Sequence, residues 1–231
     1  AVTYMRIPAD LALNISIFCE VPAGASTGTS AAVTVALLAA LDTVRGRRLS
    51  AHELAYAAQA VETQLLKRQC GIQDQLAAAY GGVCYIDMFA YPNASVSRLT
   101  LPDHTLNELD RRLLLIFLGR THNSSHVHER VIRDLEDAGP DDPRIEALRT
   151  TAPKSRDALF ANDFVAFGRA MIENTEAQSN LNAALVGSDA RRVIEIAQAH
   201  GALGWKVNGA GGEGGSVTVL SNERAGATRE M

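Results

Sequence analysis

The segment Pro22-Ala-Gly-Ala-Ser-Thr-Gly-Thr-Ser30 decides the fold, because it joins two apolar stretches with different patterns. The stretch before it, Leu11–Val21, is apolar at alternating positions, which predicts a strand. The stretch after it, Ala31–Val44, is apolar on nearly every side, which predicts a buried helix that ends at Gly46. We therefore expect a strand, a loop of small and hydroxyl residues, and a helix.

This loop has the composition of a phosphate-binding turn. Its two glycines let the backbone approach an anion, and the start of the next helix offers unpaired N–H groups and a favourable dipole. Ser30 lies at the helix start, where its hydroxyl could contact a phosphate or the Mg²⁺ bound to it. A tight N-cap of small residues without a ligand is the alternative. The loop is not a Walker A motif, because no Gly-Lys-[Ser/Thr] follows.

Composition limits the classes of function. The 231 residues are 47% hydrophobic and 21% charged, which is typical of a globular chain. The net charge of -4 argues against nucleic acid or an anionic membrane as partner. The longest apolar stretch, Ala31–Leu41, is about half of what a membrane-spanning helix needs. Three scattered cysteines without a CxxC pair, and a start without a signal peptide, predict a cytoplasmic protein with reduced thiols.

A second glycine-rich stretch covers residues 201–215, where seven of fifteen residues are glycine. Predicted strands at 202–208 and 216–220 overlap or follow it, and it contains Trp205 and Lys206. A flexible linker is one interpretation. A backbone packed closely against another loop or a ligand explains the composition better.

Two acidic residues between these loops could serve phosphoryl transfer, which needs a metal ion and often a carboxylate that takes the hydroxyl proton. Glu62 falls on a helix that a capping box at Ser50–Glu53 opens, and Asp74 follows a glycine break. A solvated helix face for Glu62, and a helix cap for Asp74, are the alternatives.

The remaining pattern predicts paired strands, a further strand and several helices, with a soft boundary near residues 90–112. The strands are expected at 83–88, 96–101 and 112–118, and the helices at 72–80, 125–138, 143–152, 162–178 and 189–200.

The two glycine-rich loops, in this order and with Asp74 between them, resemble the GHMP kinases, the superfamily of galactokinase, homoserine kinase and mevalonate kinase. In that family a Pro-x-Gly-x-Gly-Leu-x-Ser-Ser-Ala type loop wraps the ATP phosphates, and residues 22–32 resemble it in part. A late Gly-Ala-Gly-Gly-Gly loop supports the first one in that family, and residues 209–215 resemble it, with Glu213 among the glycines. The segments Gly71–Gly82 and His122–Glu129 look most like the heptose-phosphate and fucose-type sugar kinases.

The resemblance implies an α+β fold, a two-part sandwich around one active-site cleft. Residues 1–110 would be the remainder of the N-terminal ATP-binding domain, and 111–231 the C-terminal domain. It implies ATP and Mg²⁺ as cofactors, with Asp74 as catalytic base and Ser30 and Glu62 as metal ligands. The implied nucleotide-binding residues are Gly24, Ser26, Thr27, Gly28, Thr29, Ser30, Gly209, Ala210, Gly211 and Gly212, and the implied substrate contacts are His122 and Ser125.

Some positions depart from the family pattern. Ser26 and Thr27 replace Gly and Leu, and a Cβ at Ser26 would crowd the phosphates if that site needs positive φ. Glu213 brings negative charge into the late loop unless it points away or pairs with a cation such as Lys206. Nothing before residue 12 matches the family's first motif, so we expect a fragment or a chain that has lost part of its site.

The expected activity is ATP- and Mg²⁺-dependent phosphorylation of a hydroxyl on a sugar or sugar phosphate, heptose-7-phosphate-like or fucose-like. A catalytically inactive GHMP homologue that binds nucleotide or sugar is the main alternative, and an ATP-dependent decarboxylase is another. Uncovered sheet edges would also allow a homodimer. A metal site at His122 and His126 would need a third ligand that the sequence does not offer.

Overall fold

Contacts divide the protein into two compact units in this computed structural model. The first unit comprises Ala1–Pro22 and Gly28–Thr100, and the second comprises Ala23–Thr27 and Leu101–Met231. The structure describes residues 1–22, 24–46, 49–120, 131–136, 138–139, 141–209 and 211–222. The α+β fold class is confirmed, because both units combine helices with antiparallel strands. The domain division at residue 110 stays a prediction.

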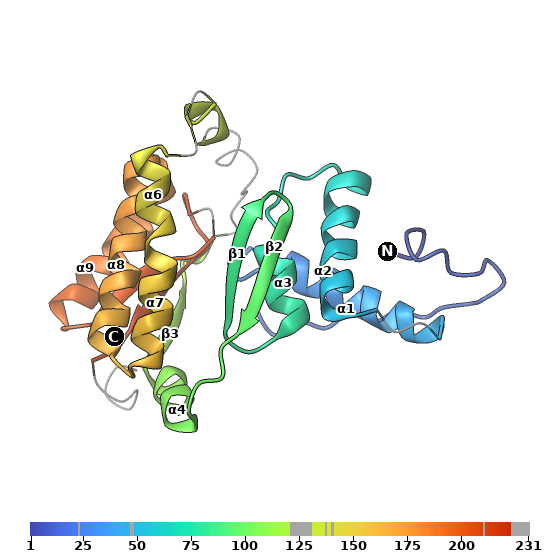
Figure 1. The fold of residues 1–231 in the computed structure, drawn as a ribbon, viewed down its shortest axis with the longest axis horizontal. Coiled ribbons are helices and arrows are strands. Elements are labelled where there is room, and N and C mark those ends of the chain that lie inside the picture. Colours follow the sequence, from blue (N-terminus) through green and yellow to red (C-terminus); the bar gives the residue numbers. More distant parts are fainter. Residues whose placement is uncertain are drawn as a thin grey trace. The chain divides into compact units, whose positions relative to one another are not determined.

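The first unit packs helices against a hairpin. It contains α1 (Thr29–Val44), α2 (Ala51–Ala60), a π-helical turn (Val61–Leu65), α3 (Gln73–Tyr80), β1 (Cys84–Ala90) and β2 (Asn93–Arg98). The strands β1 and β2 pair antiparallel (Figure 1). The capping box is confirmed: Ser50 Oγ accepts from the Glu53 N–H, and a Glu53 carboxylate oxygen accepts from the Ser50 N–H at 2.7 Å. Buried apolar residues of α1, α2 and the turn form its core: Val35, Leu38, Leu41, Ala57, Ala58 and Val61.

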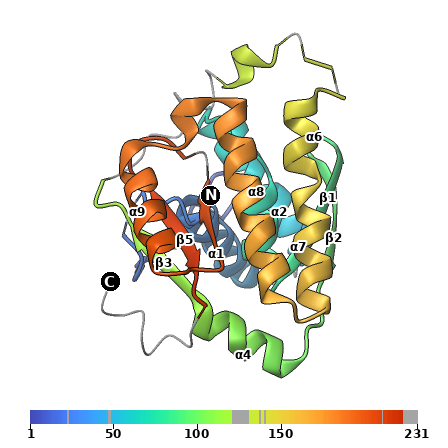
Figure 2. The same ribbon diagram turned by 90° about the vertical axis from the view of Figure 1, so that its left-hand side faces the viewer.

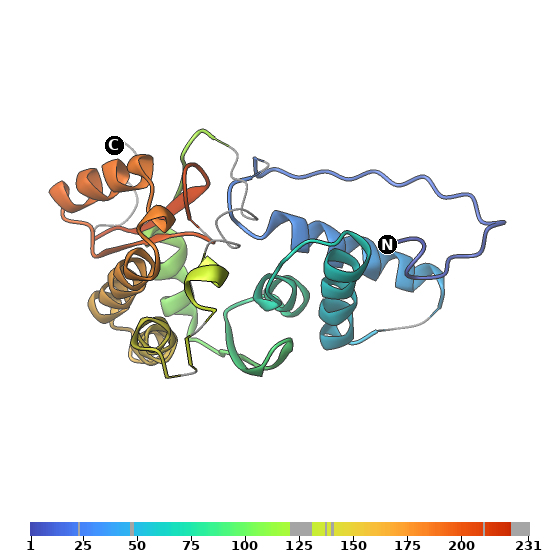
Figure 3. The same cartoon turned by 90° about the horizontal axis from the view of Figure 1, so that it is seen from above.

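The strand prediction for Leu11–Val21 is wrong. The segment is extended but pairs with no strand in the described part of the chain, and Figure 3 shows it as a trace with no strand beside it. Its alternating side chains find no core: Ile17 is 61% exposed and Phe18 is 86% exposed. Alternation predicts a strand only where a neighbouring strand can take up the backbone N–H and C=O groups.

The second unit builds a three-stranded antiparallel sheet with helices around it. It contains α4 (Asp103–Arg112), β3 (Leu113–Phe117), α6 (Pro143–Arg149), α7 (Thr151–Phe160), α8 (Phe164–Leu181), α9 (Ser188–Ala199), β4 (Gly204–Val207) and β5 (Ser216–Leu220). The strand order is β3–β5–β4, with Val217 opposite both Ile116 and Val207. The pattern did not predict α4 or α7, and the helix predicted at 143–152 ends earlier, at Arg149.

The two faces of this sheet differ in chemistry. Val207, Val217 and Val219 belong to a core cluster that also holds Ala190 and Ala197 of α9. The residues next to them in sequence, such as Lys206 and Thr218, line a cavity of about 310 Å³ together with residues of α7 and α8. Figures 1 and 2 show α7 and α8 running side by side there.

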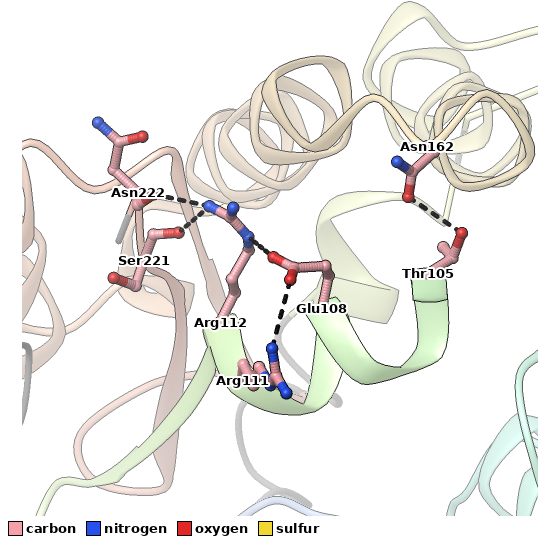
Figure 4. Close-up of polar contacts among 7 residues, drawn as sticks. All are labelled: Thr105, Glu108, Arg111, Arg112, Asn162, Ser221 and Asn222. Carbon is pink, nitrogen blue, oxygen red and sulfur yellow. Dashed lines mark hydrogen bonds and ion pairs between the residues drawn. The ribbon is translucent and has the colours of Figure 1, made fainter. Parts of the chain in front are cut away.

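Arg112, the last residue of α4, binds the backbone that directly follows β5. Arg112 Nη1 donates to the carbonyls of Asn222 at 2.6 Å and Ser221 at 3.4 Å, and its Nε donates to Glu108 at 2.8 Å (Figure 4). The guanidinium also lies 5.4 Å from the centre of the Phe164 ring at the start of α8. One arginine therefore ties α4, α8 and the strand that follows the glycine-rich loop.

Candidate active site

The second half of the phosphate loop opens α1 in the first unit. Gly28 is the N-cap with φ 69°, and it offers no side-chain hydrogen bond to the N–H groups of the first helical turn. Such a helix start is suited to an anion, because the backbone N–H groups and the helix dipole both favour negative charge.

Ser30 and Glu62 meet directly in this unit. Ser30 Oγ donates to Glu62 Oε1 at 3.0 Å, and Thr34 Oγ1 lies 3.5 Å from the same oxygen. Glu62 is only 4% exposed, and it stands in the π-helical turn, a distortion that is frequent at functional sites. The carboxylate is therefore buried beside the helix start instead of lying on a solvated face.

Asp74 also lies close to the helix start. A Cβ placed on Gly28 would be 3.3 Å from Asp74 Cγ and 3.5 Å from its Oδ2. Glycine therefore suits this position through its positive φ, and a Cβ here would also crowd the exposed Asp74 carboxylate. The first unit thus gathers Gly28, Ser30, Glu62 and Asp74 from three separate segments.

These donors suit a magnesium ion that phosphates help to hold. A hydroxyl and a carboxylate oxygen are hard ligands, and Mg²⁺ usually takes only one or two protein ligands and completes its shell with phosphate and water. Within the described ranges no group of three or more His, Cys, Asp or Glu side chains is placed to hold a metal ion. Cys70 is near Glu62, but burial, with the nearby Glu62 charge, raises the pKa of its thiol to about 11, so the thiol stays protonated.

The first half of the phosphate loop packs within the second unit. Ser216 Oγ donates to the Ala25 carbonyl, and a Cβ on Gly209 would lie 3.2 Å from Ser26 Cβ. Ser26 has φ 54°, so the position where the family has glycine does need a left-handed backbone here. The late glycine-rich loop therefore supports the phosphate loop by direct contact.

The late loop is also packed against its own unit. A Cβ on Gly211 would come 1.7 Å from the Leu185 carbonyl oxygen, and one on Gly214 would come 2.7 Å from the Arg120 carbonyl oxygen. The sequence left open whether another loop or a ligand packs against these glycines. In the described residues, other backbone segments of the same unit pack against them.

Glu213 turns away from Lys206. Its carboxylate oxygens lie 3.4 Å from the N–H and from Oγ of Ser188, at the N-terminus of α9, where the helix dipole favours negative charge. Lys206 Nζ instead donates to Gln178 Oε1 at 2.9 Å and to the Val207 carbonyl. Both acceptors are uncharged, so this largely enclosed ammonium group has no hydrogen-bonded carboxylate among the residues that the structure describes.

We expect Lys206 to make the second unit more stable at alkaline pH. Burial lowers the pKa of Lys206 to about 8 from the ordinary 10.5. Below pH 8 both the folded and the unfolded protein carry the charge, and the folded state bears the full desolvation penalty. Between these values the unfolded state binds more protons, so the free energy of unfolding rises with pH, by about 2 kcal/mol between pH 7 and pH 10.

Urea unfolding at pH 7 and pH 10 measures this effect, with Lys206→Met as the comparison. The difference between wild type and variant should change by that amount, which removes the contribution of tyrosines and other lysines. Parallel pH profiles for the two proteins would contradict the expectation.

Several residues expected at the site lie outside the described residues, namely His122, Ser125 and Ala210. Two neighbours of Glu62 were missed. Thr34 follows Ser30 by four residues, so helical spacing would have placed both on one face of α1. Gln75, whose Nε2 donates to Glu62 Oε2 at 3.2 Å, carried no periodic signal, because only the tertiary fold brings it there.

Both ends of the chain match models of known protein families. Residues 1–82 match the GHMP kinases N terminal domain, and residues 155–229 match the GHMP kinases C terminal domain. Across the described residues no helix is long and apolar enough to cross a membrane.

Individual relatives agree with these matches. The chain is 25% identical over 216 residues to a D-glycero-alpha-D-manno-heptose 7-phosphate kinase of Campylobacter jejuni, covering 91% of this chain and 63% of that protein. It is 31% identical over 212 residues to a mevalonate kinase of Methanothermobacter thermautotrophicus, covering 89% of this chain and 63% of the relative. The crystal structure of a D-glycero-D-manno-heptose 1-phosphate kinase from Bacteriodes thetaiotaomicron superposes with a TM-score of 0.64 at 21% identity, covering 91% of this chain and 57% of that one. The chain thus spans about 63% of the length of these two curated relatives.

Proposed function

Because the chain belongs to the GHMP kinase family, we propose that it serves ATP- and Mg²⁺-dependent phosphorylation of a hydroxyl on a sugar or sugar phosphate. The observation that carries the proposal is the meeting of Ser30, Glu62 and Asp74 at the start of α1. The similarity to a heptose 7-phosphate kinase supports a sugar-phosphate acceptor. Residues 1–110 and 111–231 are proposed as the two family domains, and the cytoplasm as the location.

Each residue has a distinct part in this proposal. Backbone N–H groups of Gly24–Ser30, supported by Gly209–Gly212, hold the β- and γ-phosphates. Ser30 and Glu62 would hold Mg²⁺, which neutralises phosphate charge when bound. Asp74 accepts or orients the hydroxyl proton while the hydroxyl oxygen bonds to the γ-phosphorus and the bond to the β–γ bridging oxygen breaks, releasing ADP.

A product assay tests the proposal. The protein is incubated with ATP, Mg²⁺ and one acceptor at a time, from a panel of heptose 7-phosphate, heptose 1-phosphate, fucose, galactose and mevalonate. We expect ADP and a new phosphomonoester, detected by ³¹P NMR, with a sugar or sugar phosphate as the best acceptor. Mevalonate as the best acceptor would contradict the substrate class.

Calorimetry of ATP binding, added to the product assay, tests the alternative of an inactive binding protein. ATP binding by calorimetry, without ADP release above background for any acceptor, would favour that alternative. Glu213 gives it no support, since its carboxylate is turned to the N-terminus of α9.

A further inference from the structure

The buried side-chain amide of Gln75 contacts the carboxylate of Glu62. One oxygen of that carboxylate, Oε1, faces the hydroxyls of Ser30 and Thr34, and the other, Oε2, accepts from Gln75 Nε2 at 3.2 Å. Gln75 is 2% exposed, and its Nε2 also lies 3.7 Å from Cys70 Sγ. The amide therefore touches Glu62 on the side away from the helix start, where bulk water does not reach.

The other end of this amide is poorly satisfied. Gln75 Oε1 is buried and has no hydrogen-bond partner in the described part of the chain. A buried acceptor without a donor destabilises the folded state, and an apolar side chain of similar volume would avoid that loss. Stability alone therefore does not account for a glutamine at this position, whereas the bond from Nε2 to Glu62 does.

From this geometry we propose that Gln75 is a positioning residue that fixes the Glu62 carboxylate with Oε1 presented to Ser30. The proposal rests on the proposed function and deepens it. The terminal torsion of a glutamate is soft, so a carboxylate held on one oxygen only can turn about its axis. A donor on Oε2 removes that freedom and keeps Oε1 facing the Ser30 hydroxyl, the other residue that would hold the metal ion.

An amide suits this role better than a cation. A lysine or arginine at the same place would neutralise Glu62 and weaken its attraction for Mg²⁺, whereas the neutral amide leaves the full negative charge. Gln75 also follows Asp74 directly in the first turn of α3. The bond from Gln75 to Glu62 thus fixes α3, and with it the candidate base, to the turn that carries the candidate metal ligand.

The test compares Gln75→Met, which removes the donor at similar volume, with Gln75→Asn, which keeps a shorter amide. Gln73→Met is the matched control, because Gln73 is exposed in the same helical turn. Mn²⁺ binding in the presence of a non-hydrolysable ATP analogue is measured by electron paramagnetic resonance, and metal-free binding of the analogue by calorimetry.

We expect Gln75→Met to raise the half-saturating Mn²⁺ concentration about tenfold, which is a loss of about 1.4 kcal/mol. Metal-free binding of the analogue should not change, and melting should shift by no more than about 3 °C, because removal of the orphan acceptor offsets the lost bond. Gln75→Asn should weaken Mn²⁺ binding by less, and Gln73→Met should match wild type. In turnover, Gln75→Met should lower kcat with KM for the acceptor unchanged.

Three outcomes overturn the inference. If Gln75→Met or, should that variant not fold, Gln75→Asn binds Mn²⁺ as wild type does, Gln75 does not position Glu62. If Gln73→Met is weakened equally, the effect belongs to α3 in general. If the wild-type protein binds the analogue but its Mn²⁺ binding does not depend on the analogue, the proposed function fails first, and this inference fails with it.

Discussion

Asp74→Asn is expected to lower kcat at least about 100-fold and to leave the Kd for ATP within about twofold of wild type. Asparagine keeps the size of the side chain and its place beside Gly28, where a Cβ on that glycine would lie 3.3 Å from Asp74 Cγ. It cannot take up a proton, so an acceptor hydroxyl would lose its base while the phosphate loop keeps its shape. Initial rates with the best acceptor, together with calorimetry of ATP binding, measure both quantities.

Asp87→Asn provides the matched control. Asp87 is an exposed carboxylate on β1 in the same unit, and the site does not include it. Its neutralisation should leave kcat unchanged within about twofold. Turnover by Asp74→Asn equal to that of Asp87→Asn would remove Asp74 from the role of base.

Features that depend on neighbouring residues were predictable from this sequence, and features that depend on tertiary contacts were not. The capping box at Ser50 and Glu53 was predictable because all of its atoms belong to four consecutive residues. The strand predicted at Leu11–Val21 failed because pairing depends on a partner that no local pattern supplies. Helix α4 was missed because its sequence is mostly polar, with Thr105 and Leu109 as its buried residues.

The candidate site divides in the same way. The glycine and hydroxyl pattern of residues 22–30, and the position of Asp74, were visible in the sequence because family motifs are contiguous. Burial of Glu62 was not, since a lone glutamate on a helix is usually solvated, whereas here Ser30 and Thr34 of α1 and Gln75 of α3 contact its carboxylate. Gln75 lies within the Gly71–Gly82 segment that resembles the sugar kinases, but its contact with Glu62 joins residues thirteen positions apart, which the local pattern does not encode.

Gly211→Ala is expected to destabilise the second unit by about 3 kcal/mol or more, a fall in melting temperature of roughly 6–12 °C. Gly211 has φ 61°, a conformation that costs an L-residue roughly 1–2 kcal/mol. The larger cost is steric: the added Cβ would fall 1.7 Å from the Leu185 carbonyl oxygen, so one of the two backbone segments must move.

Gly201→Ala separates the two contributions, because it shares the unit and the positive φ, 71°, but meets nothing within 4 Å. It should lose only the conformational cost, about 2–8 °C in melting temperature by differential scanning calorimetry. Equal losses for the two variants would show that Gly211 is not held against Leu185. Its glycine would then be required by something else that approaches the loop, and nucleotide binding by the folded Gly211→Ala protein would become the decisive measurement. A much larger loss for Gly211→Ala means instead that the shape of this loop is set by the fold before any nucleotide binds.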